Sequence, residues 1–239
     1  VYGETKNIRA VMNLFAAEKY RMAGAGPKLA EAVFGQDGYI LVSSYNDAAQ
    51  KLYRHFRKNW TEVGDLKRYF SVLGEHKLLP SCHPEVHRRI FRDSSRERLP
   101  AGRQAQNDIR VEIVEEVLNE FDEFWARARE RYPVTIERSA DYLNWRFINH
   151  PFFKYEFLAA KKDGKPAGFL VYRFEEVNDF KIARIIDFIA EESAEEELLP
   201  EFLKRARSEG AHAADFMFSG SLYSNSLKRV GFFDVAGTD

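Results

Sequence analysis

The residues Arg21-Met22-Ala23-Gly24-Ala25-Gly26 form a short glycine-containing stretch between two apolar segments. The segment before it, Ala10 to Ala16, is apolar enough for a β-strand, and Lys28 to Phe34 after it has the apolar spacing of an amphipathic helix. A loop in this position presents backbone N–H groups, and the helix adds the positive end of its dipole. The stretch is therefore a candidate pyrophosphate-binding loop. A Gly-x-Gly pair between two elements is also typical of a plain tight turn.

A second pattern follows the next expected strand, Tyr39 to Ser43. Asn46 would cap a helix that runs to about Phe56 and carries Ala49, Leu52 and Tyr53 on one side. An R-x-x-G-x-G stretch followed by N-x-x-A-x-x-L-Y resembles the acetyl-CoA-binding signature of the GNAT superfamily of N-acyltransferases. The resemblance covers Phe15 to about Phe56.

This resemblance implies an acyl-CoA-dependent N-acyltransferase, in particular an N-acetyltransferase, with acetyl-CoA or another acyl-CoA as co-substrate and a primary amine as acceptor. The implied cofactor-binding residues are Arg21, Met22, Ala23, Gly24, Ala25, Gly26 and Asn46. Tyr53 would be the general acid that protonates the leaving thiolate, and an aromatic core residue is the competing interpretation. The glycine that usually follows this tyrosine in the superfamily is missing, since Phe56 to Trp60 contains none.

The C-terminal half, Val134 to Phe233, resembles the same superfamily, notably in Arg138 to Phe147, in His150-Pro151 and in the Asp163-Gly164 hairpin. Such a run is associated with tandem GNAT proteins, many linked to surface-polysaccharide synthesis, which suggests an amino sugar as acceptor. The counterpart of the glycine loop, Glu191 to Glu197, has no glycine and a row of glutamates that would repel a pyrophosphate. We therefore expect this unit to be degenerate and not to bind coenzyme A in the usual way.

We predict an α/β (α+β) fold of two GNAT-like units, each a twisted mixed β-sheet flanked by helices. Residues 1–79 would form the coenzyme A-binding unit, 80–108 a linker rich in Arg, Ser, Pro, Gly and Gln, and 109–239 the second unit. The strand, loop, helix, strand, helix order of Ala10 to Trp60 recurs in Ile182 to Phe233. The first copy lacks the elements that precede this order in the second. We therefore expect it to be incomplete at its N-terminus, with truncation of the chain as the favoured explanation.

The remaining expected elements follow from apolar periodicity and turn residues. They are a strand or hairpin at Thr61–Leu73, strands at Arg110–Val114, Tyr155–Lys161, Pro166–Phe174, Ile182–Ala190 and Ala213–Phe218, and helices at Glu116–Arg131, Ala140–Ile148, Glu196–Ser208 and Tyr223–Val230.

The composition limits the classes of partner that the chain can have. The 36 basic and 37 acidic residues give a net charge of −1, which removes the broad attraction that non-specific nucleic-acid binding needs. A single cysteine excludes an internal disulfide, and no stretch approaches the roughly 18 apolar residues of a transmembrane helix. We expect a folded cytoplasmic protein with a small-molecule acceptor, no nucleic-acid partner and no membrane span.

Three further groups of residues are ambiguous. Cys82, His83 and His87 lack a second ligand cluster, so we predict no metal site. A base could be a water relayed from Glu18 or Asp187, although Asp187, in an apolar strand, is favoured as a partnered structural group. An aromatic run could stack on a sugar or a base but is favoured as core; its members are Trp145, Phe147, Phe152, Phe153 and Tyr155.

The missing glycine after Tyr53, the acidic loop of the second unit and the absence of an obvious base leave an alternative open. The chain would then be a non-catalytic GNAT-like protein that binds acyl-CoA or a partner without turnover.

Overall fold

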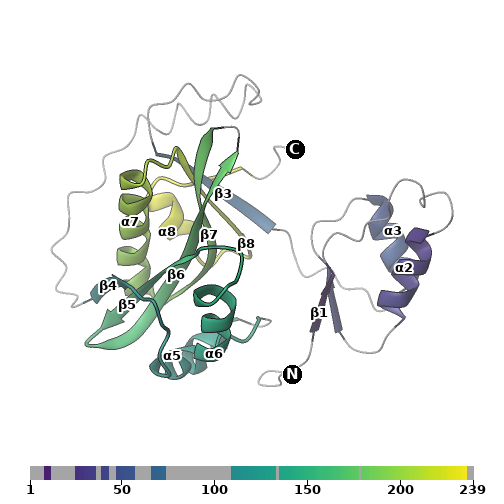
Figure 1. The fold of residues 1–239 in the computed structure, drawn as a ribbon, viewed down its shortest axis with the longest axis horizontal. Helices are drawn as coiled ribbons and strands as arrows, with labels where there is room; N and C mark the ends of the chain where they lie inside the picture. The colour runs from purple at the N-terminus through teal and green to yellow at the C-terminus, as the bar shows by residue number, and fades with distance from the viewer. Residues whose placement is uncertain are drawn as a thin grey trace. The chain divides into compact units, whose positions relative to one another are not determined.

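The computed structural model describes residues 8–11, 25–35, 39–42, 47–56, 66–73, 109–132, 135–177 and 179–235. The chain divides into two compact units, Val1–Val63 and Gly64–Asp239 (Figure 1). Helices and strands mix in both units, which confirms the predicted α+β class.

The larger unit is built on a seven-stranded mixed sheet with the order β4-β5-β6-β7-β8-β3-β9. Every neighbouring pair is antiparallel except β7 and β8, which are parallel. The strands are β3 (Leu66–Val72), β4 (Ile109–Ile113), β5 (Glu156–Lys162), β6 (Lys165–Val177), β7 (Phe180–Ala190), β8 (Ala213–Ser219) and β9 (Phe233–Asp234).

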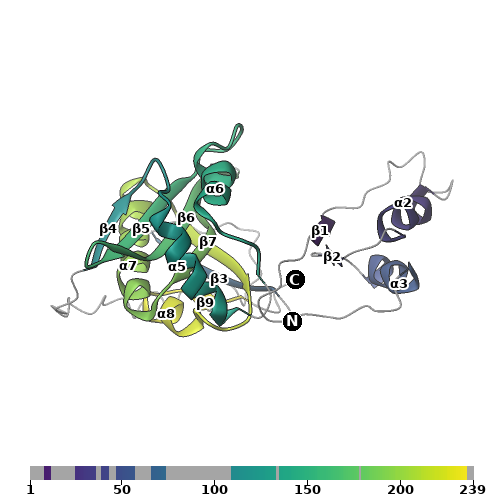
Figure 2. The same cartoon turned by 90° about the horizontal axis from the view of Figure 1, so that it is seen from below.

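Helices cover both faces of this sheet (Figures 1 and 2). One core lies between the sheet and the pair α7 (Glu192–Ser208) and α8 (Ser224–Arg229). The other lies under the α5 region, which comprises α5 (Glu120–Ala128), the 3-10 turn η1 (Arg129–Arg131), α6 (Ala140–Leu143) and the π-helical turn η2 (Asn144–Ile148). Because successive strand residues point to opposite faces, β6 serves both cores.

The alternation along β6 is clear. Leu170 and Tyr172 pack in the core under α7, and Phe169 and Val171 pack in the core under α5. β6 is joined to β5 by the expected Asp163-Gly164 turn, in which both residues have positive φ, 50° and 78°. Two left-handed residues are what a tight hairpin turn of this twist requires, and Asp-Gly supplies them at low cost.

The parallel strands β7 and β8 part before their ends. Their pairing runs from Ile182–Ala213 to Ile185–Phe216 and then stops. At this point the register with β6 shifts by one residue, a β-bulge that increases the local bend of the strand. β7 continues to Ala190 and β8 to Ser219, so their carboxyl ends are not paired with each other.

The smaller unit contains the parallel pair β1 (Ile8–Val11) and β2 (Tyr39–Val42), with α2 (Ala25–Phe34) between them in sequence and α3 (Asp47–Phe56) after them. Parallel neighbours need a crossover, which α2 provides. The order β1-α2-β2-α3 is the same as β7-α7-β8-α8, as the internal repeat predicts.

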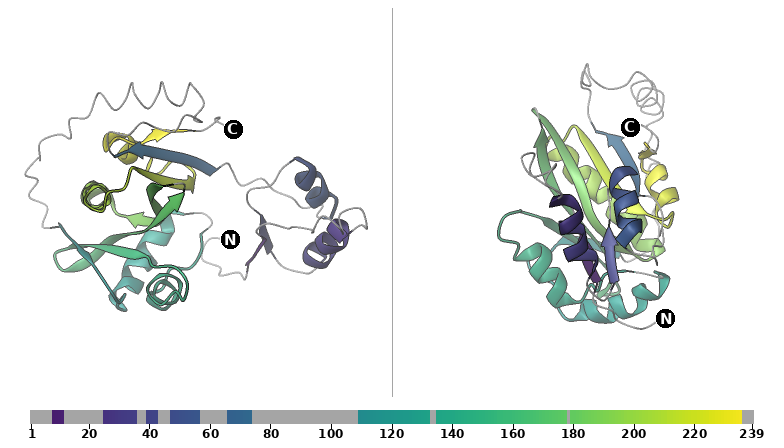
Figure 3. Two further views of the ribbon diagram at one scale, coloured as in Figure 1. Left: turned by 45° about the horizontal axis from the view of Figure 1, so that its top comes forward. Right: turned by 90° about the vertical axis from the view of Figure 1, so that its right-hand side faces the viewer.

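The expected boundary between the units is wrong in one respect. We placed Thr61–Leu73 in a first unit that ended at residue 79, but β3 joins the sheet of the second unit, between β8 and β9 (Figure 3). It pairs with β8 along its whole length, from Leu66–Ser219 to Val72–Ala213. The buried Tyr69 belongs to the core under α7, and its hydroxyl donates to Ser224 Oγ at 2.7 Å. The proposed linker, 80–108, lies outside the described residues.

Removal of the Tyr69 ring should destabilise the larger unit alone. Tyr69 is 1% exposed, so Tyr69→Ala should lower the free energy of unfolding of residues 64–239 by roughly 3–5 kcal/mol. Tyr69→Phe keeps the ring and removes one hydrogen bond, which should cost about 1 kcal/mol. Denaturant unfolding of the full chain, with hydrogen exchange to locate the loss, measures both. A loss of protection confined to α2 and α3 would place β3 with the first unit after all.

Candidate functional site

The glycine stretch meets the start of a helix in the first unit. Ala25 and Gly26 form the first residues of α2, so Gly24 immediately precedes the helix. The first turn of a helix carries N–H groups without helical partners and the positive end of the dipole. A Cβ placed on Gly26 would meet no described atom within 4 Å, so packing among these residues does not require glycine there. Arg21, Met22, Ala23 and Gly24 lie outside the described residues, as does Asn46, which directly precedes α3.

Tyr53 lies in the small core of the first unit. Its ring is 4% exposed and is 4.8 Å from the ring of Phe34, and Ala30 completes the buried cluster. Burial raises the pKa of the Tyr53 hydroxyl above its usual value. The hydroxyl therefore stays protonated at neutral pH, as both a proton donor and a core residue require. Tyr53 therefore packs as a core residue of the first unit.

The corresponding junction in the second unit is a helix and not a loop. We expected the helix to begin at Glu196, but α7 begins at Glu192. The N–H groups of Ala194 and Glu195 donate to the carbonyl of Glu191, and the Glu191 N–H donates to Ala167. Acidic residues stabilise the first turn of a helix through its dipole, which explains the earlier start. No glycine interrupts this turn.

Side chains occupy the place where β7 and β8 part. The Ala190 N–H donates to the Tyr223 hydroxyl at 3.3 Å, and Arg131 Nη1 donates to the Ala190 carbonyl at 2.6 Å. Tyr223 in turn forms a hydrogen bond with the hydroxyl of Tyr132. Burial is the main cause that raises the pKa of both phenols. The backbone groups at the end of β7 are therefore already satisfied by the chain.

A buried carboxylate lies next to this place. Glu195 is 4% exposed, accepts from Ser226 Oγ at 2.6 Å and lies 3.7 Å from Arg131 Nη2. Burial raises the pKa of the Glu195 carboxyl, and the hydrogen bond from Ser226 and the charge of Arg131 offset only part of this effect.

Glu195 should make the larger unit less stable as pH rises. Because the pKa of Glu195 is higher in the folded chain than its usual 4.5, the folded state binds the proton more tightly, and stability falls as pH rises from 4.5 through the folded pKa. Glu195→Gln removes this titration and keeps an acceptor for Ser226. The melting temperature of the variant should exceed that of the wild type at pH 8, and the two should converge at pH 4. Glu196→Gln, on the exposed face of α7, is the control. A difference that is constant with pH would contradict the assignment.

Asp187 has the partner that its position in an apolar strand requires. Arg138 Nε donates to Asp187 Oδ2 at 2.8 Å, and the two side chains are 16% and 11% exposed. Arg138 also donates to Thr135 Oγ1 and to the Ile136 carbonyl. Asp187 therefore has the partner that the structural interpretation requires, while Glu18 lies outside the described residues.

The aromatic run is only in part a core feature. Phe147 is buried, but the prediction is wrong for Trp145, Phe152 and Phe153, which are 68%, 86% and 50% exposed. The reason is the turn after η2, where His150 Nδ1 accepts from the N–H groups of Phe152 and Phe153 at 3.2 and 3.0 Å. This turn directs both phenyl rings away from the core.

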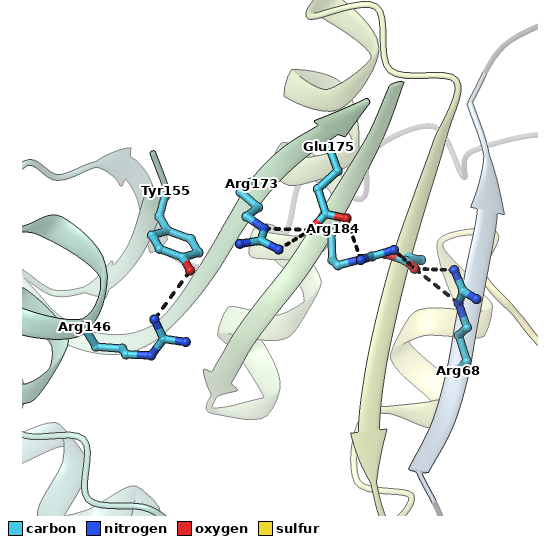
Figure 4. A network of polar contacts seen from close by, with 7 residues as sticks. Arg68, Arg146, Tyr155, Arg173, Glu175 and Arg184 are labelled. Atoms are coloured by element: carbon cyan, nitrogen blue, oxygen red, sulfur yellow. Dashed lines mark hydrogen bonds and ion pairs between the residues drawn. The ribbon is translucent and has the colours of Figure 1, made fainter. Parts of the chain in front are cut away.

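A chain of charged residues, which the sequence reasoning missed, crosses the sheet on the face opposite α7 (Figure 4). Asp215 on β8 is 1% exposed and accepts from Arg68 on β3 and Arg184 on β7, with nearest distances of 2.8 and 2.9 Å. Glu175 on β6 accepts from Arg184 and from Arg173. We call Arg68, Arg173, Arg184, Glu175 and Asp215, together with the neighbouring Arg146, the arginine belt. The sequence signal was a charged residue inside each of four largely apolar strands.

No group of three His, Cys, Asp or Glu residues that could hold a metal ion occurs in the described part of the chain, and Cys82, His83 and His87 lie outside it. None of the described helices is long and apolar enough to cross a membrane.

Solved structures share this arrangement of strands and helices. A probable N-acyltransferase from Enterococcus faecalis superposes with a TM-score of 0.59 and 10% identity over 96% of this chain and 52% of that one. A GCN5-related N-acetyltransferase from Anabaena variabilis gives 0.56 and 16% over 89% and 48%. The chain has a GNAT-type fold. It spans about half the length of these two proteins.

A functionally unknown conserved protein from Staphylococcus epidermidis gives a TM-score of 0.50 at 12% identity, over 95% of this chain and 79% of that one. No protein-family model matches the sequence, and no curated protein does. At identities this low the likeness establishes the GNAT-type fold, and the activity has to be argued from the site.

Proposed function

We propose that the chain is an acyl-CoA-dependent N-acyltransferase, an N-acetyltransferase in the first instance, that acts on a primary amine. The observation that carries the proposal is the start of α2 at Ala25, directly after Arg21 to Gly24, within a strand, helix, parallel strand unit of a chain with a GNAT-type fold. A phosphate at this helix start would meet unpaired N–H groups and the helix dipole. The resemblance of the sequence suggests an amino sugar as the acceptor.

Some residues of the first unit would bind the coenzyme A pyrophosphate, and Tyr53 would transfer a proton. Acyl-CoA would supply the acyl group as an activated thioester. The backbone of Arg21 to Gly26 and the Arg21 guanidinium would hold the pyrophosphate, and no described atom within 4 Å of a Cβ position on Gly26 would obstruct its approach. Asn46 would fix the start of α3 and hence the position of Tyr53. As the amine nitrogen bonds to the carbonyl carbon and the C–S bond breaks, Tyr53 Oη would give its proton to the thiolate, and the proton lost by the nitrogen would restore the phenol through water.

Gly24→Glu should weaken coenzyme A binding. A carboxylate at the helix start would occupy the phosphate position and repel it, so calorimetric titration with acetyl-CoA and desulfo-coenzyme A should show affinity at least tenfold weaker than wild type, or about 1.4 kcal/mol. Ala32→Glu adds the same charge on the exposed face of α2 and should bind like the wild type. Absence of binding in the wild type would refute the acyltransferase proposal.

Burial of Tyr53 favours a second candidate, a GNAT-like protein that binds acyl-CoA without turnover. Tyr53→Phe separates the two because it keeps the contact with Phe34 and removes only the hydroxyl. An enzyme that uses this acid should lose about 10²–10⁴-fold in kcat and keep its affinity for coenzyme A. A binding protein would show coenzyme A affinity with no measurable transfer to an amine panel in either form. Equal turnover of both forms would remove Tyr53 from the mechanism.

A further inference from the structure

The arginine belt of the second unit carries more positive than negative charge. Three arginines of the belt pair with its two carboxylates, and Arg146 adds a fourth positive charge, so two positive charges are in excess. Asp215 is enclosed by Arg68 and Arg184, and Glu175 by Arg173 and Arg184. The side chains of Arg68 and Arg184 are 43% and 33% exposed, so the belt can be reached from solvent.

Arg146 is the member without a carboxylate partner among the described residues. Its polar contacts among these residues are with two phenols: Nη1 lies 3.5 Å from the Tyr155 hydroxyl, and the Tyr142 hydroxyl also forms a hydrogen bond with the guanidinium. The side chain is only partly buried. An arginine retains five N–H donors in a planar fork that matches the oxygens of a phosphate. Arg146 therefore offers an anion a charge-assisted hydrogen bond that the chain does not itself use.

Tyr155 brings Arg146 and Arg173 to one place. The guanidinium carbons of the two arginines lie 5.9 and 5.8 Å from the centre of its ring. Figure 4 shows Arg146 and Arg173 next to Tyr155, with the rest of the belt beyond Glu175. Two guanidinium groups beside one ring form a position that favours an anion with more than one charged oxygen.

A ring surface adjoins this position. The guanidinium of Arg173 lies 4.3 Å from the centre of the Phe153 ring, which is 50% exposed. His150 Nδ1 fixes the turn by accepting the N–H groups of Phe152 and Phe153, so their exposure is built into the backbone. Exposed aromatic rings next to arginines are suited to stacking against a planar or pyranose ring.

We propose that the belt at Arg146 and Arg173, with the Phe153 ring, binds a phosphorylated molecule that carries a ring. The phosphate would bridge the Arg146 and Arg173 guanidinium groups, and the ring would lie against Phe153. This site is on the second unit and does not depend on acyl transfer or on coenzyme A binding by the first unit.

Titration of the full chain with UDP, glucosamine 6-phosphate and inorganic phosphate tests the proposal. At least one of the two ring-bearing phosphates should bind at least tenfold more tightly than inorganic phosphate, and its affinity should fall with added salt because charges are involved. Arg146→Gln should weaken that binding at least tenfold. Phe153→Leu removes the ring from a half-exposed side chain, and it should reduce the preference for a ring over inorganic phosphate.

The control is Arg110→Gln, which removes an exposed arginine from the edge strand β4 and should bind like the wild type. The proposal is overturned if neither ring-bearing phosphate binds more tightly than inorganic phosphate, or if Arg146→Gln and Phe153→Leu both bind like the wild type. Adsorption to phosphatidylcholine vesicles containing phosphatidylglycerol, without affinity for the soluble phosphates, would also overturn it and assign the surface to a membrane.

Discussion

The buried carboxylate of Asp215 is the constraint on which the larger unit depends. A carboxylate that is 1% exposed is strongly destabilising unless it is paired, and the cost of an unpaired buried charge is several kcal/mol. Arg184 on β7 pairs with Asp215 and lies directly opposite it in the strand register. Arg68 on β3 also pairs with Asp215 and lies two residues from the position opposite it. The need to pair the Asp215 carboxylate therefore favours β7 and β3 as the neighbours of β8, in the register observed. Shared carboxylates extend the same pairing to β6 through Glu175.

Local sequence signals predicted most of the helices and strands, but they did not predict which strands pair across long distances in the sequence. The Asp163-Gly164 turn was predictable because few residue pairs accept two positive φ angles, and the crossover helices were predictable from their apolar period. The pairing partner of β3 was not predictable, because the pattern of Leu66–Val72 indicates a strand but does not indicate which strand lies beside it. Its proximity in sequence suggested that this strand belongs to the first unit. Arg68 links the strand to β8, but this role can be recognised only once Asp215 is known to be buried.

The candidate site divides in a similar way. The start of α2 beside the glycine stretch could be predicted because helix starts and glycine loops have local signatures. The exposure of Phe152 and Phe153 could not, since it rests on the imidazole of His150 accepting two N–H groups, a tertiary detail of one turn. Hydrophobic residues are usually buried, and that general rule is what misplaced them. The belt was not predicted because each of its charged residues, taken alone, is an ordinary polar residue of a strand or, for Arg146, of a helical turn.

Backbone pairing holds β3 in its sheet, so the connection to β4 does not have to position it. Thirty-five residues separate Leu73 from Ile109, and the entropic cost of closing a connection grows only with the logarithm of its length, about 0.6 kcal/mol for each doubling. Lengthening, shortening or replacing this segment should change the sheet little. An insertion in this connection would therefore leave the order of the strands on either side of it unchanged.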